Sequence, residues 1–192
     1  MKNDKANTDL RVKRTHKLLW SALGELLLDP KKEFSSITIN EICEKAMVHR
    51  TTFYKHFVDK YDLLNLFFLQ FQDEFRKNSL EDRIEIPFQT IERNPKRKMM
   101  DIIALKQKND KTLMNFYKNH IKEVLMLDFL ELKQRGKKFE IPIEIIAEFY
   151  ASTISSLNIW WIQNRGNVSA VQMDEYFNQM TNKSLFSIRE SS

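Results

Sequence analysis

The sequence predicts an all-helical protein in which a small three-helix N-terminal domain precedes a helical bundle. Three observations favour this class. The 192 residues include only 3 Gly and 4 Pro, so long segments contain no residue that ends a helix. Runs of β-branched residues with period-two alternation are almost absent. Apolar residues recur instead at helical spacing along most of the chain.

Composition indicates a globular protein, and the distribution of charge favours one kind of binding partner. Hydrophobic residues make up 42% and charged residues 30% of the chain, a globular balance. Residues 1–60 carry 12 Lys and Arg against 8 Asp and Glu, whereas residues 61–192 carry 19 against 18. The net charge of +5 is therefore mostly N-terminal. This asymmetry favours a polyanion as partner of the first third, although such charges more often form a solvated face.

The N-terminal helices are expected in this order. The first spans about Asp9 to Asp29, because apolar residues recur at helical spacing and Pro30 ends the pattern. Thr38 opens the second helix with a capping box to Glu41. The pattern breaks at Met47 and resumes in HRTTFYKHF, so two short helices joined by a tight turn are predicted.

The rest of the chain should hold a longer set of helices. A fourth helix is expected from Asp59 to about Asn78, and it bridges domains of residues 1–60 and 61–192. Residues 84–98 contain two prolines and mixed charges, which predicts a connector with little regular structure. Further helices are expected over about 97–107, 111–135, 142–164 and 169–188, giving eight or nine in total.

The segment from Thr38 to Phe57 has the properties of a helix-turn-helix. Phe53 and Phe57 are four residues apart and share a buried face, whereas donors occupy the exposed positions of the second helix. Arg50 can make a bidentate contact with guanine, and Lys55 suits phosphate. Duplex DNA is therefore the expected partner. The predicted DNA-binding set is Thr38, His49, Arg50, Thr51, Thr52, Tyr54, Lys55, His56 and Lys60.

The segment TINEICEKAMVHRTTFYKHFVDKYDLL resembles the signature of the TetR family of regulators, and the resemblance covers about residues 10 to 65. In that family the motif ends in an aromatic residue, Tyr, a basic residue, His and Phe, and a Lys opens helix four. The corresponding residues here are Phe53, Tyr54, Lys55, His56, Phe57 and Lys60. The resemblance implies phosphate contacts by Tyr54, His56 and Lys60, and base contacts by Arg50, Thr51 and Thr52.

Two positions depart from the family pattern. The turn usually carries Gly where Met47 stands, and the second helix usually starts with Ser, Thr or Asn where His49 stands. If the turn requires a positive φ, a residue with a side chain costs about 1 kcal/mol there. His49 is a weaker cap, but it can donate to a phosphate when protonated.

The C-terminal half shows apolar stripes that first of all make a core. Their richness in Phe and Met would also suit a small apolar or aromatic effector, bound by Phe67, Phe71, Met114, Tyr117 and Trp160. The helix over 142–164 is apolar on two sides, so one side is expected to face a second subunit. The predicted dimer interface comprises Phe149, Ser152, Ser156, Phe177, Met180 and Ser184. The family resemblance also implies a homodimer.

Other functions have little support in the sequence. The four histidines, His16, His49, His56 and His120, form no ligand pair at helical spacing, so neither a metal nor another cofactor is expected. No phosphate-cradling loop or nucleophile elbow appears, and no catalytic residue is expected. The N-terminus has no apolar stretch typical of a signal peptide, and no window is long enough to span a membrane, so the expected location is the cytoplasm.

These observations lead to one hypothesis and one alternative. The hypothesis is a repressor that binds a near-palindromic operator as a homodimer and is released by a small-molecule effector. The alternative is a TetR-like adaptor or coactivator that acts through protein–protein contacts. Intact donors at Arg50, Tyr54, Lys55 and His56 favour the first, because an adaptor has no need of them.

Overall fold

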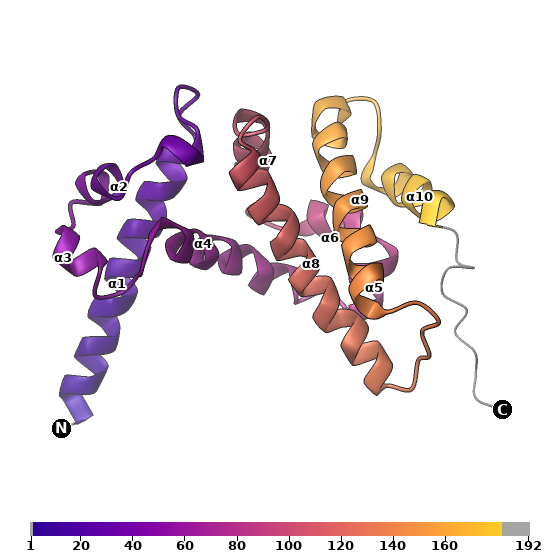
Figure 1. The fold of residues 1–192 in the computed structure, drawn as a ribbon, viewed down its shortest axis with the longest axis horizontal. Coiled ribbons are helices and arrows are strands. Elements are labelled where there is room, and N and C mark those ends of the chain that lie inside the picture. Colours follow the sequence, from indigo (N-terminus) through magenta and orange to yellow (C-terminus); the bar gives the residue numbers. More distant parts are fainter. Residues whose placement is uncertain (1, 182–192) are drawn as a thin grey trace. The chain divides into compact units, whose positions relative to one another are not determined.

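The computed structural model describes residues 2–181, with side chains from residue 10 onward. All regular structure in this part of the chain is helical, so the predicted fold class is confirmed (Figure 1). The chain divides into two compact units, residues 1–70 and 71–192. The division falls inside α4 (Lys60–Phe75), the helix expected to bridge the two domains.

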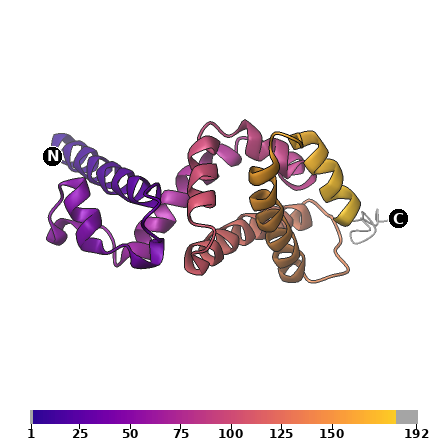
Figure 2. The same cartoon turned by 90° about the horizontal axis from the view of Figure 1, so that it is seen from above.

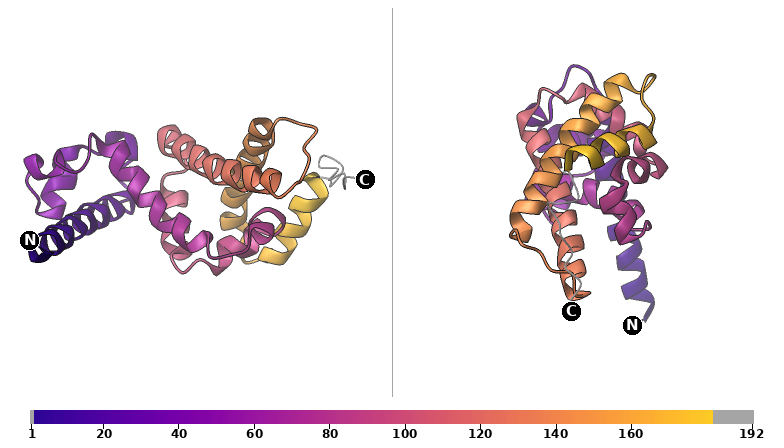
Figure 3. Two further views of the ribbon diagram at one scale, coloured as in Figure 1. Left: turned by 90° about the horizontal axis from the view of Figure 1, so that it is seen from below. Right: turned by 90° about the vertical axis from the view of Figure 1, so that its right-hand side faces the viewer.

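The first unit is built on one long helix. It comprises α1 (Lys2–Leu27), a short 3-10 turn (Phe34–Ser36), α2 (Ile39–Ala46), α3 (Arg50–Phe53) and the start of α4. Helix α1 packs against α2 along one side of the unit (Figure 3). Its glycine, Gly24, lets the ring of Phe67 approach, since a Cβ there would lie 3.2 Å from Phe67 Cε2. The core of the unit consists of fully buried apolar side chains: Leu19, Leu23, Leu27, Phe34, Ile42, Phe53, Leu63, Leu64 and Phe67.

As far as Thr181, the second unit contains the end of α4 and six further helices. They are α5 (Leu80–Glu85), α6 (Pro87–Arg93), α7 (Arg97–Lys106), α8 (Lys111–Gln134), α9 (Ile143–Asn164) and α10 (Ala170–Thr181). Helices α8 and α9 pack against each other, and α10 packs against α6 (Figure 2). The last four lie close to the predicted boundaries, except that α10 is described only to Thr181.

The prediction of an irregular connector over residues 84–98 is wrong, because α5 ends at Glu85 inside it, α6 occupies residues 87–93, and α7 begins at Arg97. Pro87 stands at the first position of α6, where its missing N–H costs no hydrogen bond. The free N–H groups of Phe88 and Gln89 donate to the carboxylate of Asp174 at 2.8 and 3.1 Å. Asp174 belongs to α10, so the cap of α6 comes from a distant part of the sequence.

Helix α9 confirms one of the two apolar faces that its sequence predicts. Ile146, Tyr150, Ile154 and Trp161 are buried in the core of the second unit. The other stripe, which includes Ile145, Phe149 and Trp160, is exposed in the single chain. A large apolar stripe left exposed on a helix indicates a surface that another protein covers.

Candidate nucleic-acid interface

The predicted capping box fixes the start of α2. The N–H of Glu41 donates to Thr38 Oγ1 at 3.2 Å, and the N–H of Thr38 donates to Glu41 Oε2 at 2.8 Å. Lys32 forms an ion pair with the same carboxylate. These contacts lower the pKa of Glu41 to about 2, with the bond from Lys32 as the largest cause and the bonds from Thr38 next. The sequence signal therefore placed this helix start correctly.

The turn between α2 and α3 adopts the left-handed conformation at Met47, with φ 52° and ψ 43°. It is the one residue other than glycine with positive φ in the described part of the chain. The N–H of Val48 donates to the Cys43 carbonyl at 2.9 Å, which closes the end of α2. The Met47 side chain is 90% exposed, so burial does not offset the backbone strain.

Helix α3 carries the exposed donors. Its α-helical span is short, but the N–H of Phe57 bonds to the Phe53 carbonyl at 2.9 Å and extends the turn. Phe53 and Phe57 are both buried, as predicted, and they anchor the helix. His49 precedes the helix as its N-cap residue and makes no side-chain capping bond. Solvent faces the opposite side, where Arg50, Thr51, Tyr54 and Lys55 are exposed and Thr52 and His56 half-buried.

Arg50 and Tyr54 interact one turn apart on this exposed face. The guanidinium carbon lies 5.8 Å from the centre of the Tyr54 ring, and Nη2 donates to the tyrosine hydroxyl at 3.4 Å. A guanidinium held against an aromatic ring loses less conformational freedom when it binds. The other edges of the guanidinium remain available, which suits bidentate recognition of a guanine.

His56 lies against α1. Its ring meets that of His16 edge-on, with 5.1 Å between the ring centres. Burial lowers the pKa of His16, and the positive charge of a protonated His56 lowers it further. Helix α1 therefore supports the turn that follows α3, from which His56 projects.

Lys60 is placed differently from the exposed donors. Its ammonium donates to the carbonyls of Phe34, Ser35 and Ile37 at 2.9, 2.9 and 2.8 Å. The same nitrogen lies 4.8 Å from the centre of the Phe34 ring. These bonds hold the loop that leads into α2, so a phosphate contact would require the ammonium to leave three carbonyl oxygens.

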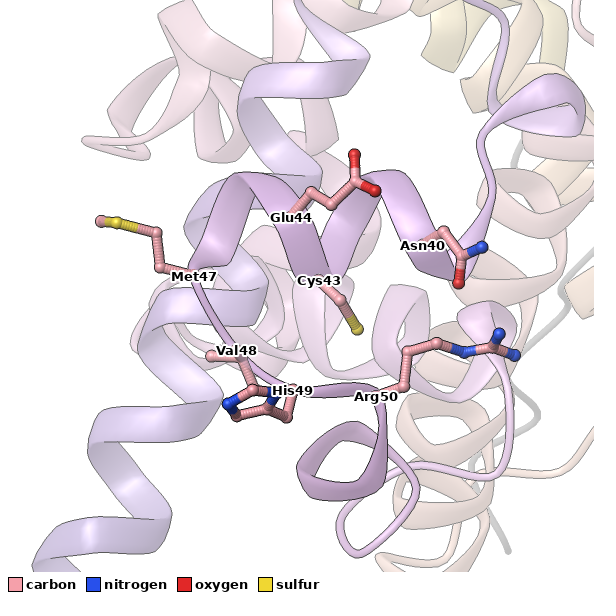
Figure 4. A pocket seen from close by; sticks show the side chains of 7 residues that line it. All are labelled: Asn40, Cys43, Glu44, Met47, Val48, His49 and Arg50. Atoms are coloured by element: carbon pink, nitrogen blue, oxygen red, sulfur yellow. The ribbon is translucent and has the colours of Figure 1, made fainter.

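A groove of about 410 Å³ separates α2 from the start of α3 (Figure 4). Its lining residues are Asn40, Cys43, Glu44, Met47, Val48, His49 and Arg50. Asn40 and Glu44 of α2 were absent from the predicted interface. Helical spacing could have found them, because the capping box at Thr38 sets the helix start and the two residues are four apart on an exposed face.

The residues predicted to bind an effector do not all belong to one unit of the chain. Phe67 belongs to the first unit and packs against Trp20, with 5.5 Å between ring centres. Among those of the second unit, Phe71 is buried, Met114 and Tyr117 are half-buried, and Trp160 is exposed. The Tyr117 hydroxyl accepts a bond from Asn158 Nδ2 at 3.3 Å, and burial raises the tyrosine pKa to about 12.

Of the predicted dimer residues, Phe149 and Met180 are exposed apolar side chains. Ser156 is exposed and Ser152 half-buried on the same helix as Phe149. Phe177 is fully buried in the core of its own unit, where the centre of its ring lies 5.3 Å from the centre of the Tyr150 ring. Ser184 lies outside the described residues.

The described residues contain neither a membrane-spanning helix nor a cluster of metal ligands. No helix among them is long and apolar enough to cross a membrane. No cluster of three or more His, Cys, Asp or Glu side chains in this part of the chain could hold a metal ion. The free cysteine, Cys43, is buried, and burial raises its thiol pKa.

The all-helical fold, with a helix-turn-helix presenting donors from its second helix, defines a DNA-binding protein. Residues 31–66 match the family model described as bacterial regulatory proteins of the tetR family. Residues 78–183, more than half of the chain, match the model of a transcriptional regulator C-terminal region. The chain therefore belongs to the TetR family of DNA-binding transcriptional regulators.

Individual relatives agree with this assignment. An uncharacterized HTH-type transcriptional regulator of Bacillus subtilis, YxbF, is 39% identical over 56 residues, which are 29% of this chain and 14% of the relative. A TetR transcriptional regulator from Streptococcus agalactiae has a TM-score of 0.61 at 20% identity, covering 92% of this chain and 98% of its own. Lin0861 from Listeria innocua reaches 0.65 at 20% identity, covering 90% and 91%. NalD, a secondary repressor of an efflux pump in Pseudomonas aeruginosa, reaches 0.56 at 17% identity, covering 92% and 98%. These structures share the fold.

Proposed function

We propose that the protein is a repressor whose two copies each place α3 in the major groove of a near-palindromic operator. The exposed donor face of α3 carries this proposal. Arg50 and Thr51 suit base edges, and Tyr54, Lys55 and His56 suit phosphates on either side. A two-fold dimer presents two such helices, so the operator should repeat its half-site with inverted symmetry. NalD, which has a similar fold, is described as a repressor.

The dimer face that we propose lies on the outer sides of α9 and α10. Phe149 is 43% exposed and Met180 is 54% exposed, and Ile145 and Val171 are also exposed apolar side chains on these helices. Ser152 and Ser156 follow Phe149 on the same face of α9, where small side chains let a second helix approach closely. Self-complementary contact of such a patch gives a closed two-fold dimer rather than a growing chain.

We further propose that a small apolar or aromatic effector binds the second unit and releases the operator. Met114 and Tyr117 are three residues apart on α8, so they share a half-buried face. The hydroxyl of Tyr117, bonded to Asn158, supplies a polar group that could orient such a ligand. Binding of the fluorescent probe 8-anilinonaphthalene-1-sulfonate tests the site. Met114→Trp should abolish that binding without changing DNA affinity, and unchanged probe binding would refute this location.

DNA binding itself is tested by fluorescence anisotropy with the DNA upstream of the protein's own gene. Wild-type protein should bind with an affinity that falls steeply with salt, because phosphate contacts release counterions. Arg50→Ala should weaken specific binding by about 5- to 150-fold. Arg93→Ala, an exposed arginine of the second unit, is the control and should bind normally. Sedimentation must show the same dimer for all three proteins. A reporter gene behind the operator should become more active when the wild-type protein is absent.

The adaptor alternative makes the opposite prediction. An adaptor would regulate its promoter equally well with Arg50→Ala, since its contacts are with another protein. The family match and the exposed donors of α3 favour direct DNA binding instead. Unchanged regulation by the Arg50 variant would therefore overturn the proposed function.

A further inference from the structure

The groove between α2 and α3 brings together side chains that differ from those of an ordinary phosphate site. Asn40 and Glu44 come from α2, and His49 and Arg50 come from the start of α3 (Figure 4). The Asn40 amide and the Arg50 guanidinium project toward the same end of the groove in this view. Both residues are exposed, so a ligand at that end can reach both.

The Asn40 amide is available for binding. Within the part of the chain that the structure describes, Asn40 makes no side-chain hydrogen bond, although its neighbour Glu41 is fully engaged in the capping box. The amide therefore offers an acceptor oxygen and two N–H donors to solvent. The stable start of α2 fixes the position from which it projects, because Thr38 and Glu41 hold the backbone on either side.

The surroundings favour a base edge over a phosphate. Glu44 lines the same groove one helical turn from Asn40, and its negative charge repels a phosphate. Cys43 is buried, and the side chain of Val48 has no polar atom. Neither of these two lining residues therefore adds a strong hydrogen-bond donor to the groove. A neutral amide that offers a donor and an acceptor together matches the N7 and N6 groups of adenine in the major groove.

We propose that Asn40 reads an adenine in each half-site, in the same major groove in which Arg50 reads a guanine. The inference rests on the proposed function, and it extends the base-reading surface from α3 to α2. Asn40 and Arg50 lie on the two sides of the protein groove between α2 and α3. The adenine and the guanine that they contact must therefore lie close together in the half-site. Asn40 thereby becomes a determinant of operator sequence rather than of general affinity.

The test selects binding sites from random duplex DNA with the full-length wild-type protein, Asn40→Ala and Asn40→Asp. Asn65→Ala is the matched control, because Asn65 is an exposed asparagine on α4. Wild-type protein and the control should select one motif that includes an adenine lost in the Asn40→Ala selection. On the wild-type motif, Asn40→Ala should bind about 5- to 150-fold more weakly. Asn40→Asp should shift the preference at that position toward cytosine, whose amino group donates to a carboxylate.

The outcomes separate this inference from the proposed function. A wild-type selection that yields no motif would overturn the proposed function. A wild-type motif that is reproduced with equal affinity by Asn40→Ala would overturn only the role of Asn40. Another outcome is that Asn40→Ala binds every sequence more weakly, with an affinity that depends less steeply on salt than that of the wild type. That result would show that Asn40 contacts a phosphate, and it would also overturn the role of Asn40 in reading a base. Circular dichroism at each step checks that the variants are folded.

Discussion

Arg83 of α5 and Asp128 of α8 form a two-point ion pair inside the second unit. Arg83 Nε and Nη2 donate to the two carboxylate oxygens at 3.0 and 2.6 Å, and both side chains are almost fully buried. A further nitrogen, Nη1, donates to the Asn78 carbonyl at 2.7 Å. The pair therefore links the start of the unit to its longest helix, and each partner satisfies a charge that burial would otherwise leave uncompensated.

Removal of one partner should destabilise the second unit strongly. Asp128→Ala leaves the Arg83 guanidinium buried without its counter-ion, and it should lower the free energy of unfolding by about 3–5 kcal/mol. Urea denaturation followed by circular dichroism measures this change. The double variant Arg83→Met with Asp128→Leu replaces the pair by apolar side chains and should recover most of the stability. A double variant as unstable as the single one would contradict this account.

Met47 should be a site where a smaller residue stabilises the protein. Its left-handed conformation is unfavourable for a side chain and its side chain is almost fully exposed. Met47→Gly should therefore raise the free energy of unfolding by about 0.5–1 kcal/mol. Thermal unfolding measures the effect, with Glu123→Gly, at an exposed position inside α8, as a control that should destabilise instead. A Met47→Gly protein less stable than wild type would show that the methionine side chain contributes to the turn.

Glu41 should give the first unit a specific dependence on acid. The folded pKa of about 2 lies below the ordinary value of 4.5, so the unfolded chain takes up the proton first as the pH falls. The stabilisation is therefore complete above about pH 4.5 and is lost between there and pH 2. The difference in urea midpoint between wild type and Glu41→Gln should shrink over this range. Glu44→Gln, an exposed carboxylate of the same helix, controls for general charge and should show a smaller change. A constant difference across this range would refute the assignment.

Lys60 and Lys55 should affect different properties, although both are lysines of the predicted DNA-binding set. Lys60→Met removes the donor to three carbonyls and should lower the free energy of unfolding by about 1.5–3 kcal/mol. Lys55→Met changes an exposed residue, so it should leave stability unchanged and make DNA binding less sensitive to salt. Denaturation and anisotropy at several salt concentrations measure the two effects. Equal stability of the Lys60 variant and wild type would show that the three bonds contribute nothing.

The sequence by itself determined the elements whose signals are local. Thr38 and Glu41 stand three residues apart and cap α2, and Phe53 and Phe57 stand four apart and share a buried face. Such pairs act over one helical turn, so spacing alone reveals them. Strain at Met47 was expected only if the turn required a positive φ, because the family that the sequence resembles usually has Gly there, and the structure has that positive φ.

Tertiary structure alone decided the features that join distant segments. Residues 84–98 were predicted to be irregular because they contain two prolines and mixed charges, but Asp174, 86 residues after Phe88, caps a helix there. Lys60 was predicted to contact phosphate, and only the fold shows that its ammonium bonds to the Phe34–Ile37 loop. Phe177 was predicted to lie in the dimer interface, yet the second unit buries it beside Tyr150. In each case the role of a residue depends on a contact with a group far away in the sequence, and a local sequence pattern cannot predict such a contact.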